Sequence, residues 1–309
     1  MKVLIIGGFG FIGKHVLENI PDTHMVAVFS DPASAEQNRT FAKEHRLKVI
    51  TGDITNPNQI NETFRAQNPD VTIHLAALTG LTKCDQDPSL AFSTNVFGTY
   101  NIIMGCIAAK SKLVFISSRE VYGEGNPTAR TTEETEPRPN NLYGTTKMLG
   151  EQLVQWAKSR FGLNYTILRL TNVYGPGGAQ YNIQAMIKSG MERALIPLYG
   201  GNQLMNLVYV NDVATVMINC LTNPRTTNEI INVGFDEDMT VEAIVKELIS
   251  QLHVPVKIQM MPMRAGETLS FRPDLQKMTT VFPDLAKTSF REGIRKTISE
   301  YHNGTPKKN

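Results

Sequence analysis

Four glycines follow the first apolar segment of the chain, at positions 7, 8, 10 and 13. Residues 2–6 (Lys-Val-Leu-Ile-Ile) are typical of a buried parallel strand, and residues 14–18 have the pattern of a helix. Glycines at such a turn let the backbone bend sharply and approach a ligand closely, while the helix N-terminus faces an anionic group. The order of strand, glycine turn and helix therefore predicts a dinucleotide-binding domain.

Acidic residues after the next two predicted strands bear on the choice of cofactor. The second strand ends at Ser30 and Asp31, and an acid there would accept hydrogen bonds from ribose hydroxyls and favour NAD over NADP. The acid comes one residue later than expected, which leaves NADP open, with Arg39 as a candidate for a 2′-phosphate. Asp53, after the third strand, is placed to accept from an adenine amino group or to serve as a turn residue.

Tyr143 and Lys147 are spaced so that one helix would present both on the same face, because positions i and i+4 are neighbours. An ammonium beside a phenol favours the phenolate. Ser118 could hydrogen-bond the same substrate oxygen. Tyr-x-x-x-Lys alone is common on solvated helix faces. Beside a dinucleotide, however, a phenol, an ammonium and a hydroxyl form a proton-transfer set suited to removing a hydride from a carbinol.

Apolar strands alternate with helical segments through the first part of the chain. The strands are expected at 3–6, 25–29, 48–50, 71–75, 112–117 and 165–170. This alternation implies right-handed crossovers and a parallel sheet covered by helices on both faces. The expected fold class is therefore α/β, with a doubly wound parallel sheet of the Rossmann type.

A smaller, discontinuous substrate domain is expected at the C-terminal end. Its helices are predicted near 181–192, 240–252 and 290–302, with another near 211–222 that belongs to the first domain. We expect a Rossmann domain at 1–171, to which residues 207–222 return. The substrate domain would then comprise 172–206 and 223–309.

These motifs together resemble the extended short-chain dehydrogenases/reductases, and more narrowly the nucleotide-sugar epimerase/dehydratase family. The similarity runs through nearly the whole chain: the glycine turn, 71–77, Asn95, 115–123, Tyr143, Lys147, 169–177 and 209–214. Such a set is specific for the family and much less specific for the substrate. The resemblance implies a nucleotide-diphosphate sugar as substrate.

The resemblance also implies roles for individual residues. The cofactor-binding set is Gly7, Gly10, Phe11, Ile12, Gly13, Asp31, Asp53, Ile54, Leu75, Ala76, Ala77, Asn95, Tyr143 and Lys147. The catalytic set is Ser118, Tyr143 and Lys147, with Glu120. The substrate-binding set is Thr79, Ser118, Arg119, Glu120, Asn172 and Arg264.

One departure from the family pattern bears on the substrate. Family members often carry an arginine in the stretch where this chain reads Gln-Leu-Met-Asn-Leu, at 203–207. One expected phosphate clamp is therefore missing, which leaves the identity of the substrate open.

The cofactor and the proton-transfer set predict transient oxidation of a sugar carbinol, expected at C4, and leave the fate of the ketone open. Return of the hydride to the other face gives a 4-epimerase, which is the prediction; a dehydratase or a uronate decarboxylase is the alternative. Family members that eliminate water often show Thr-Asp-Glu where this chain has Ser118, Arg119 and Glu120. Arginine does not serve as a general acid near neutrality, so 4,6-dehydration is disfavoured.

Two interpretations of this pair remain. In one, Glu120 is structural and Arg119 is its solvated neighbour. In the other, Arg119 pairs with the carboxylate of a uronic acid. A non-catalytic NAD(P)-binding scaffold is a remote further alternative, disfavoured because the proton-transfer set is intact.

Composition excludes some partners. The 309 residues carry 31 basic and 29 acidic side chains, a net charge of +2, so nucleic acid or a membrane surface is not expected as a partner. No apolar run approaches the ~18 residues of a membrane helix, so membrane insertion is not expected. Cys84, Cys106 and Cys220 have neither an even count nor metal-ligand spacing, which indicates packing residues in a reducing cytoplasm and no metal.

Two predicted helices, near 92–110 and 144–160, carry apolar residues at helical intervals. Core packing against the sheet would explain them. The family resemblance implies instead that part of these faces pairs with a second subunit, so a homodimer is expected.

Overall fold

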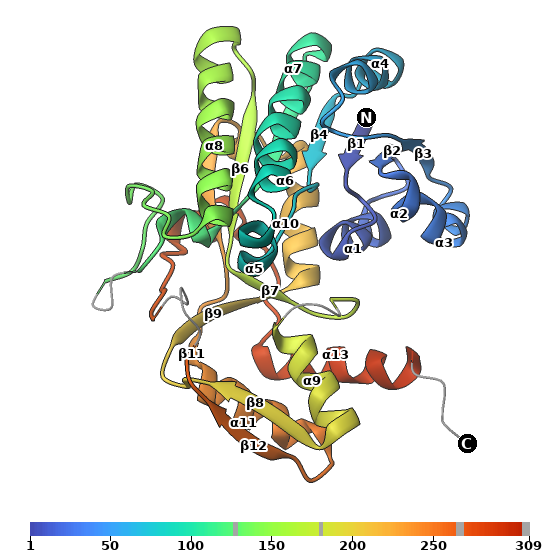
Figure 1. Cartoon of the computed structure of the whole chain (residues 1–309). Coiled ribbons are helices and arrows are strands. Elements are labelled where there is room, and N and C mark those ends of the chain that lie inside the picture. The colour runs from blue at the N-terminus through green and yellow to red at the C-terminus, as the bar shows by residue number, and fades with distance from the viewer. Residues whose placement is uncertain (126–128, 179–181, 264–268, 305–309) are drawn as a thin grey trace.

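The computed structural model of the chain describes residues 1–125, 129–178, 182–263 and 269–304. Its larger part is a seven-stranded sheet in the order β10-β6-β5-β4-β1-β2-β3, and every neighbouring pair is parallel (Figure 1). The strands are β1 (Lys2–Ile6), β2 (Met25–Ser30), β3 (Lys48–Thr51), β4 (Val71–His74), β5 (Lys112–Ser118), β6 (Tyr165–Leu170) and β10 (Glu229–Val233). The predicted doubly wound parallel sheet is confirmed.

Helices cover both faces of this sheet, which explains why its central strands are apolar on both sides. One face packs on α1 (Phe11–Asn19), α2 (Pro32–Gln37), α3 (Arg39–Glu44), α10 (Val210–Thr222) and α12 (Gln276–Val281). The other face packs on α4 (Pro57–Gln67), α7 (Thr99–Ala109) and α8 (Leu142–Phe161). Each face forms its own hydrophobic core, so the strand ends are held rigidly.

A smaller part lies beyond the carboxyl ends of these strands (Figure 1). It holds a three-stranded sheet, β11 (Asp238–Thr240), β9 (Leu204–Tyr209) and β7 (Asn172–Tyr174), and a parallel pair, β12 (Lys257–Met261) and β8 (Leu195–Tyr199). Its helices are α9 (Asn182–Arg193), α11 (Val241–Leu252) and α13 (Phe290–Gly304). Tyr174, Ile187, Ile196, Leu248 and Ile294 belong to its separate core.

Two features bear on the division of the chain into domains, which stays a prediction. Helix α10 packs against α1, on the larger part. Strand β10, at residues 229–233, is the edge strand of the large sheet, although the sequence division placed 223–309 with the smaller part.

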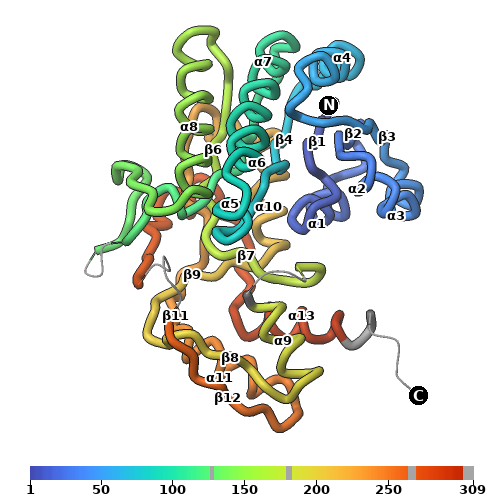
Figure 2. The backbone as a smooth tube through the Cα atoms, viewed as in Figure 1, coloured from blue at the N-terminus to red at the C-terminus, as the bar shows by residue number. Residues whose placement is uncertain are grey.

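Short elements connect β4 to the long helix α7. They are α5 (Leu81–Gln86), α6 (Pro88–Phe92) and the π-helical turn η1 (Ser93–Gly98). Two further short turns are η2 (Arg119–Tyr122) and η3 (Pro224–Thr226). The backbone trace in Figure 2 shows α7 and α8 standing side by side, and they are in contact.

The helical stretch Pro88–Ala109 is, by length and composition alone, apolar enough to cross a membrane. This corrects the expectation that no apolar segment reaches that length, because scattered polar residues do not lower its mean hydropathy enough. The same composition is found in core helices of soluble proteins, and 44% of the most apolar window is buried inside the protein. The finding is therefore weak support for a membrane span.

Candidate active site

A cavity of about 900 Å³ lies at the carboxyl ends of the parallel strands. Crevices at this edge are where open α/β sheets bind ligands. Every described residue of the expected cofactor-binding, catalytic and substrate-binding sets lines this cavity, apart from Asn95. Arg264 lies outside the described residues.

The glycine turn is shaped to hold a pyrophosphate. Gly7 has a φ of +80°, and a Cβ there would meet the backbone nitrogen of Ala76 at 2.7 Å. A Cβ at Gly13 would collide with the backbone of Gly8, so the helix can start close to the strand only if position 13 is glycine. Gly10, the N-cap of α1, lines the cavity. Backbone amides at a helix N-terminus favour an anion, so the turn fits the diphosphate of a dinucleotide.

Two carboxylates line the other end of the cavity. Asp31 caps α2, and its Oδ1 accepts from the Ser34 amide at 2.9 Å. Partial burial alone would raise the pKa of Asp31, but hydrogen bonds from Ser34 and from the neighbouring backbone together hold the pKa below its usual range. Asp53 accepts from the Thr55 amide at 2.8 Å, so it is a turn residue that also lines the cavity. An ionised Asp31 suits ribose hydroxyls and repels a 2′-phosphate.

Arg39, the candidate partner for a 2′-phosphate, does not line this cavity. Its guanidinium lies 3.6 Å from Glu36, and its side chain is 81% exposed. The arrangement at this end of the cavity therefore favours NAD over NADP.

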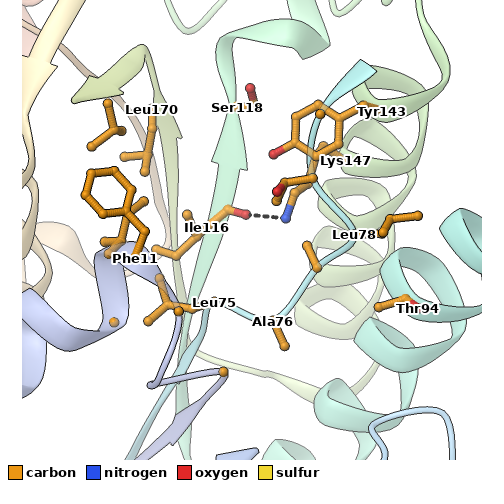
Figure 3. Close-up of a pocket in the computed structure, with 18 of the residues that line it drawn as sticks. Phe11, Leu75, Ala76, Leu78, Thr94, Ile116, Ser118, Tyr143, Lys147 and Leu170 are labelled. Atoms are coloured by element: carbon orange, nitrogen blue, oxygen red, sulfur yellow. Dashed lines mark hydrogen bonds between the residues drawn. The ribbon is translucent and has the colours of Figure 1, made fainter. Parts of the chain in front are cut away.

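Helix α8 carries Tyr143 and Lys147 to the cavity (Figure 3). Asn141 caps the helix by accepting from the Gly144 amide at 2.8 Å. The Lys147 Nζ donates to the Ile116 carbonyl at 2.8 Å and lies 6.0 Å from the centre of the Tyr143 ring. Burial lowers the pKa of Lys147 to about 8, and the charge of Glu151 opposes that shift. The ammonium is thus placed to stabilise a phenolate on Tyr143.

Ser118 ends β5 on the same wall (Figure 3). Its Oγ accepts from the Glu120 amide at 3.2 Å and so caps η2. A hydroxyl that accepts one bond still has its own proton to donate. Ser118 can therefore both hold the turn and orient a substrate oxygen.

Arg119 and Glu120 form a tight pair beside Ser118. The Arg119 Nη2 lies 2.6 Å from Glu120 Oε1, and Oε2 accepts from Asn141 Nδ2 at 2.8 Å. The guanidinium also lies over the Phe271 ring, 5.5 Å from its centre. Its Nε and Nη1 are buried and have no hydrogen-bond partner. Both oxygens of Glu120 are engaged, which supports the structural interpretation of this residue.

Asn95 was expected to bind the cofactor, and the structure places it beside the cavity without lining it: it is 2% exposed. Its Nδ2 donates to the Leu78 carbonyl and to Thr146 Oγ1, both at 3.0 Å, and its Oδ1 accepts from the Leu78 amide at 2.7 Å. These bonds use its donors and its acceptor, so Asn95 holds the cavity wall in place from behind.

The cavity wall near β7 and β9 combines apolar and polar residues. Met205 lines it in the stretch where an arginine was expected, next to Leu207. Thr79 and Asn172 also line the cavity, and Asn172 Nδ2 donates to the Asn206 carbonyl at 3.1 Å. Among the described lining residues, the cations are Lys147 and Arg119, and both have acceptors. The departure seen in the sequence thus removes a positive charge from this surface.

Several lining residues escaped the sequence analysis: Leu78, Gly80, Leu81, Leu90, Thr94, Ile183 and Leu207. The first three directly follow the recognised motif at 71–77, and that continuity was the available signal. The others come from separate elements, and only the folded chain brings them to the cavity.

The model of the NAD dependent epimerase/dehydratase family matches residues 3–234, so the chain belongs to this family. A UDP-N-acetyl-alpha-D-glucosaminuronate decarboxylase of Bacillus cytotoxicus is 26% identical, with 96% of each chain covered. A putative UDP-glucose 4-epimerase of Methanocaldococcus jannaschii is 28% identical over 96% of this chain and 97% of the other. Both similarities span essentially full chains.

Solved structures agree. The UDP-glucose 4-epimerase of Thermus thermophilus, in complex with NAD, has a TM-score of 0.87 at 26% identity, covering 99% of this chain and 100% of the other. The Thermotoga maritima UDP-glucose 4-epimerase with UDP-glucose has a TM-score of 0.89 at 25% identity, covering 98% and 99%. The predicted family, Rossmann-type fold, enzyme class and NAD cofactor are confirmed. The roles of individual residues stay predictions.

Proposed function

We propose that the chain is an NAD-dependent nucleotide-sugar 4-epimerase that oxidises C4 of the sugar transiently and returns the hydride to the other face. The observation that carries this proposal is the convergence of Ser118, Tyr143 and Lys147 on one wall of the cavity that also contains the glycine turn. The epimerases among the relatives and solved structures support it.

The proposed chemistry divides between cofactor and side chains. Bound NAD supplies the hydride acceptor. Tyr143 takes the proton from the C4 hydroxyl and later returns it, and the Lys147 ammonium stabilises the phenolate in between. Ser118 orients the C4 oxygen by hydrogen bonding. Gly7, Gly10 and Gly13 would hold the diphosphate of NAD, and Asp31 and Asp53 its adenosine end.

The state of Glu120 favours epimerisation over elimination. Removing a proton from C5 and expelling a C6 hydroxyl requires an acid and a base in addition to Tyr143. Glu120 is held by Arg119 and Asn141 and is only 9% exposed, so it is poorly placed for that exchange. Rotation of the 4-keto sugar, so that its other face receives the hydride, needs no further acid or base.

A uronate decarboxylase or a dehydratase is the second candidate. Arg119 lines the cavity beside Ser118, and two of its nitrogens have no hydrogen-bond partner. A guanidinium in this position could receive a sugar carboxylate if it turned away from Glu120. The Bacillus cytotoxicus relative is named as a decarboxylase of such a sugar, and other relatives are named as dTDP-glucose dehydratases.

The apolar surface of α6, η1, α7 and α8 supports the proposal of a homodimer. Large apolar residues are exposed there: Leu90, Phe92, Phe97, Tyr100, Trp156 and Phe161. Burying such a patch against its own copy is the usual arrangement in symmetric dimers.

The three buried free cysteines are consistent with a cytoplasmic location.

The decisive experiment is incubation of the purified protein with a panel of nucleotide sugars, including uronic acids and N-acetylhexosamines, with products identified by NMR. We expect a C4 epimer from wild type, and turnover lower by roughly two to four orders of magnitude in Tyr143→Phe, since a positioned acid/base is lost. A protein that carries NAD and converts no sugar would instead be a non-catalytic scaffold.

A further inference from the structure

A buried ion pair lies directly behind the catalytic wall and outside the cavity lining. Glu151 and Arg169 are 2% and 3% exposed. Glu151 Oε2 accepts from Arg169 Nη2 at 2.7 Å, and Oε1 accepts from Nε at 3.0 Å. A buried ion pair often stabilises a fold no better than apolar residues of the same size. Its position therefore points to a role other than bulk stability.

Successive residues of β5 bond to successive turns of α8. The Ile116 carbonyl accepts from Lys147 Nζ at 2.8 Å, and the Ser117 hydroxyl donates to Glu151 Oε1 at 2.5 Å. These two residues of β5 and the next one along the strand, Ser118, line the cavity. Because Lys147 and Glu151 are one turn apart, the two bonds together fix α8 against β5. They thereby hold Tyr143 and Lys147 opposite Ser118.

Arg169 extends the network to the turn that follows β5. Its Nη1 donates to the Tyr122 hydroxyl at 2.8 Å, and that hydroxyl donates to Asn232 Oδ1 at 2.7 Å. Tyr122 belongs to η2, the turn that carries Arg119 and Glu120. The network therefore ties α8, β5, β6, β10 and η2 together behind the site.

The charged and titratable groups around this pair can be followed element by element. The groups that interact electrostatically with Lys147 are Tyr143, Glu151, His74 and Cys84. Those that face Glu151 are Arg169, Tyr122 and Tyr165. Burial lowers the pKa of His74 to about 3 and raises the pKa of the Cys84 thiol, so both are neutral near pH 7. Glu151 thus supplies the negative charge that acts on Lys147 among the described groups.

We propose that Glu151 is a positioning residue for the proton-transfer set: through Ser117 it holds β5 against α8, one helical turn from Lys147. The chemistry of this inference rests on the proposed function, because it takes Lys147 to assist Tyr143. Arg169 balances the carboxylate and extends the tether to η2. A purely structural ion pair would support the fold equally well but would leave the titration of Lys147 unchanged.

The test follows Lys147 directly, by NMR of protein labelled with ¹⁵N-lysine and saturated with NAD. The Nζ signal of Lys147 is identified by its loss in Lys147→Met. In Glu151→Gln the titration of Lys147 should move to lower pH by about one unit, because the stabilising charge is lost. The pH profile of turnover should move in the same direction. Glu229→Gln is the matched control: it neutralises the carboxylate of the Glu229–Lys277 pair at the sheet edge, and should move neither.

Ser117→Ala tests the tether separately, because it leaves both charges in place. We expect turnover about tenfold lower than wild type, since a hydrogen bond that orients the catalytic groups is lost, with no acid shift of the Lys147 titration. Should Glu151→Gln fail to fold because Arg169 is left unpaired, the double variant Glu151→Gln/Arg169→Met removes both buried charges. It should still move the Lys147 titration to lower pH.

An unchanged Lys147 titration in a folded variant lacking the Glu151 carboxylate would overturn the inference. Wild-type turnover in Ser117→Ala would overturn the tether. The proposed function can fail separately: if wild type converts no nucleotide sugar while Glu151→Gln still shifts Lys147, the coupling stands and the epimerase assignment is lost.

Discussion

Lys147 shows how a catalytic group can weaken the fold that holds it. Its ammonium is buried, and burial lowers its pKa from 10.5 to about 8. Below pH 8 the Lys147 ammonium is buried in the folded protein and solvated in the unfolded chain, so its charge lowers the free energy of unfolding. Between pH 8 and 10.5 the unfolded chain binds more protons than the folded one, so stability rises with pH in that window.

We therefore expect Lys147→Met to be at least as stable as wild type at pH 7. Its advantage should shrink by up to about 3 kcal/mol as the pH rises from 8 to 10.5, because wild type sheds its buried charge there. Urea unfolding of both NAD-free proteins at several pH values measures the difference. A difference that does not change with pH would contradict this account of Lys147.

Arg119 decides between a neutral sugar and a uronic acid. Since Glu120 already balances its charge, we expect a uronic-acid nucleotide and its neutral parent to bind wild type with dissociation constants within about tenfold. Calorimetry on wild type and Arg119→Leu measures this preference. Tighter binding of the uronic acid by ~1.5–3 kcal/mol, erased in Arg119→Leu, would favour the decarboxylase.

At the residue scale, the sequence predicted those site residues whose roles depend on local chain geometry. Gly7 and Gly13 are needed where a strand turns into a helix, and that need is visible in the sequence. The position of Asn95 behind the cavity wall could not be read from the sequence, because the direction of its amide depends on Leu78 and Thr146, which distant segments bring together. The Glu151–Arg169 pair was missed for the same reason: it exists only once α8 covers the sheet.

At the element scale, α8 depends on close packing against β5. A Cβ at Gly150 would meet the Cζ of Phe115 at 2.7 Å, in the core between helix and strand. Gly150→Ala should therefore lower the free energy of unfolding by about 1–3 kcal/mol, although alanine is the better helix former. Gln152→Ala, at an exposed position of the same helix, is the control. If Gly150→Ala were as stable as wild type in urea unfolding, or more stable, the Phe115 ring would have to move aside at little energetic cost.

The strands of the large sheet were predictable because parallel strands are continuous apolar runs between helices. Strand β10 was not, since 229–233 follows the smaller part's first segments in the chain, and only pairing with β6 assigns it to the large sheet. The short helices α5 and α6 were also missed, because their few residues carry too little periodicity to separate them from a loop.

At the scale of the whole molecule, the exposed apolar face of α6 to α8 predicts the oligomeric state. Phe97 is 64% exposed within this face. We expect wild type to sediment as a dimer and Phe97→Glu as a monomer, because a charge cannot be buried unpaired at the interface. Met25→Glu, at a 69% exposed apolar residue of β2, should stay dimeric. A monomeric wild type would refute the proposed dimer.

The central claim is that the 4-keto sugar is formed and then reduced again with nothing else removed. Running the reaction in deuterated water tests it, because epimerisation at C4 never breaks the C5–H bond, whereas dehydration or decarboxylation leaves solvent-derived hydrogen at C5. We expect a C4-epimeric hexose without deuterium at C5 and without carbon dioxide, and substantial activity in Glu120→Gln. Deuterium at C5, or carbon dioxide release that Glu120→Gln abolishes, would contradict the account.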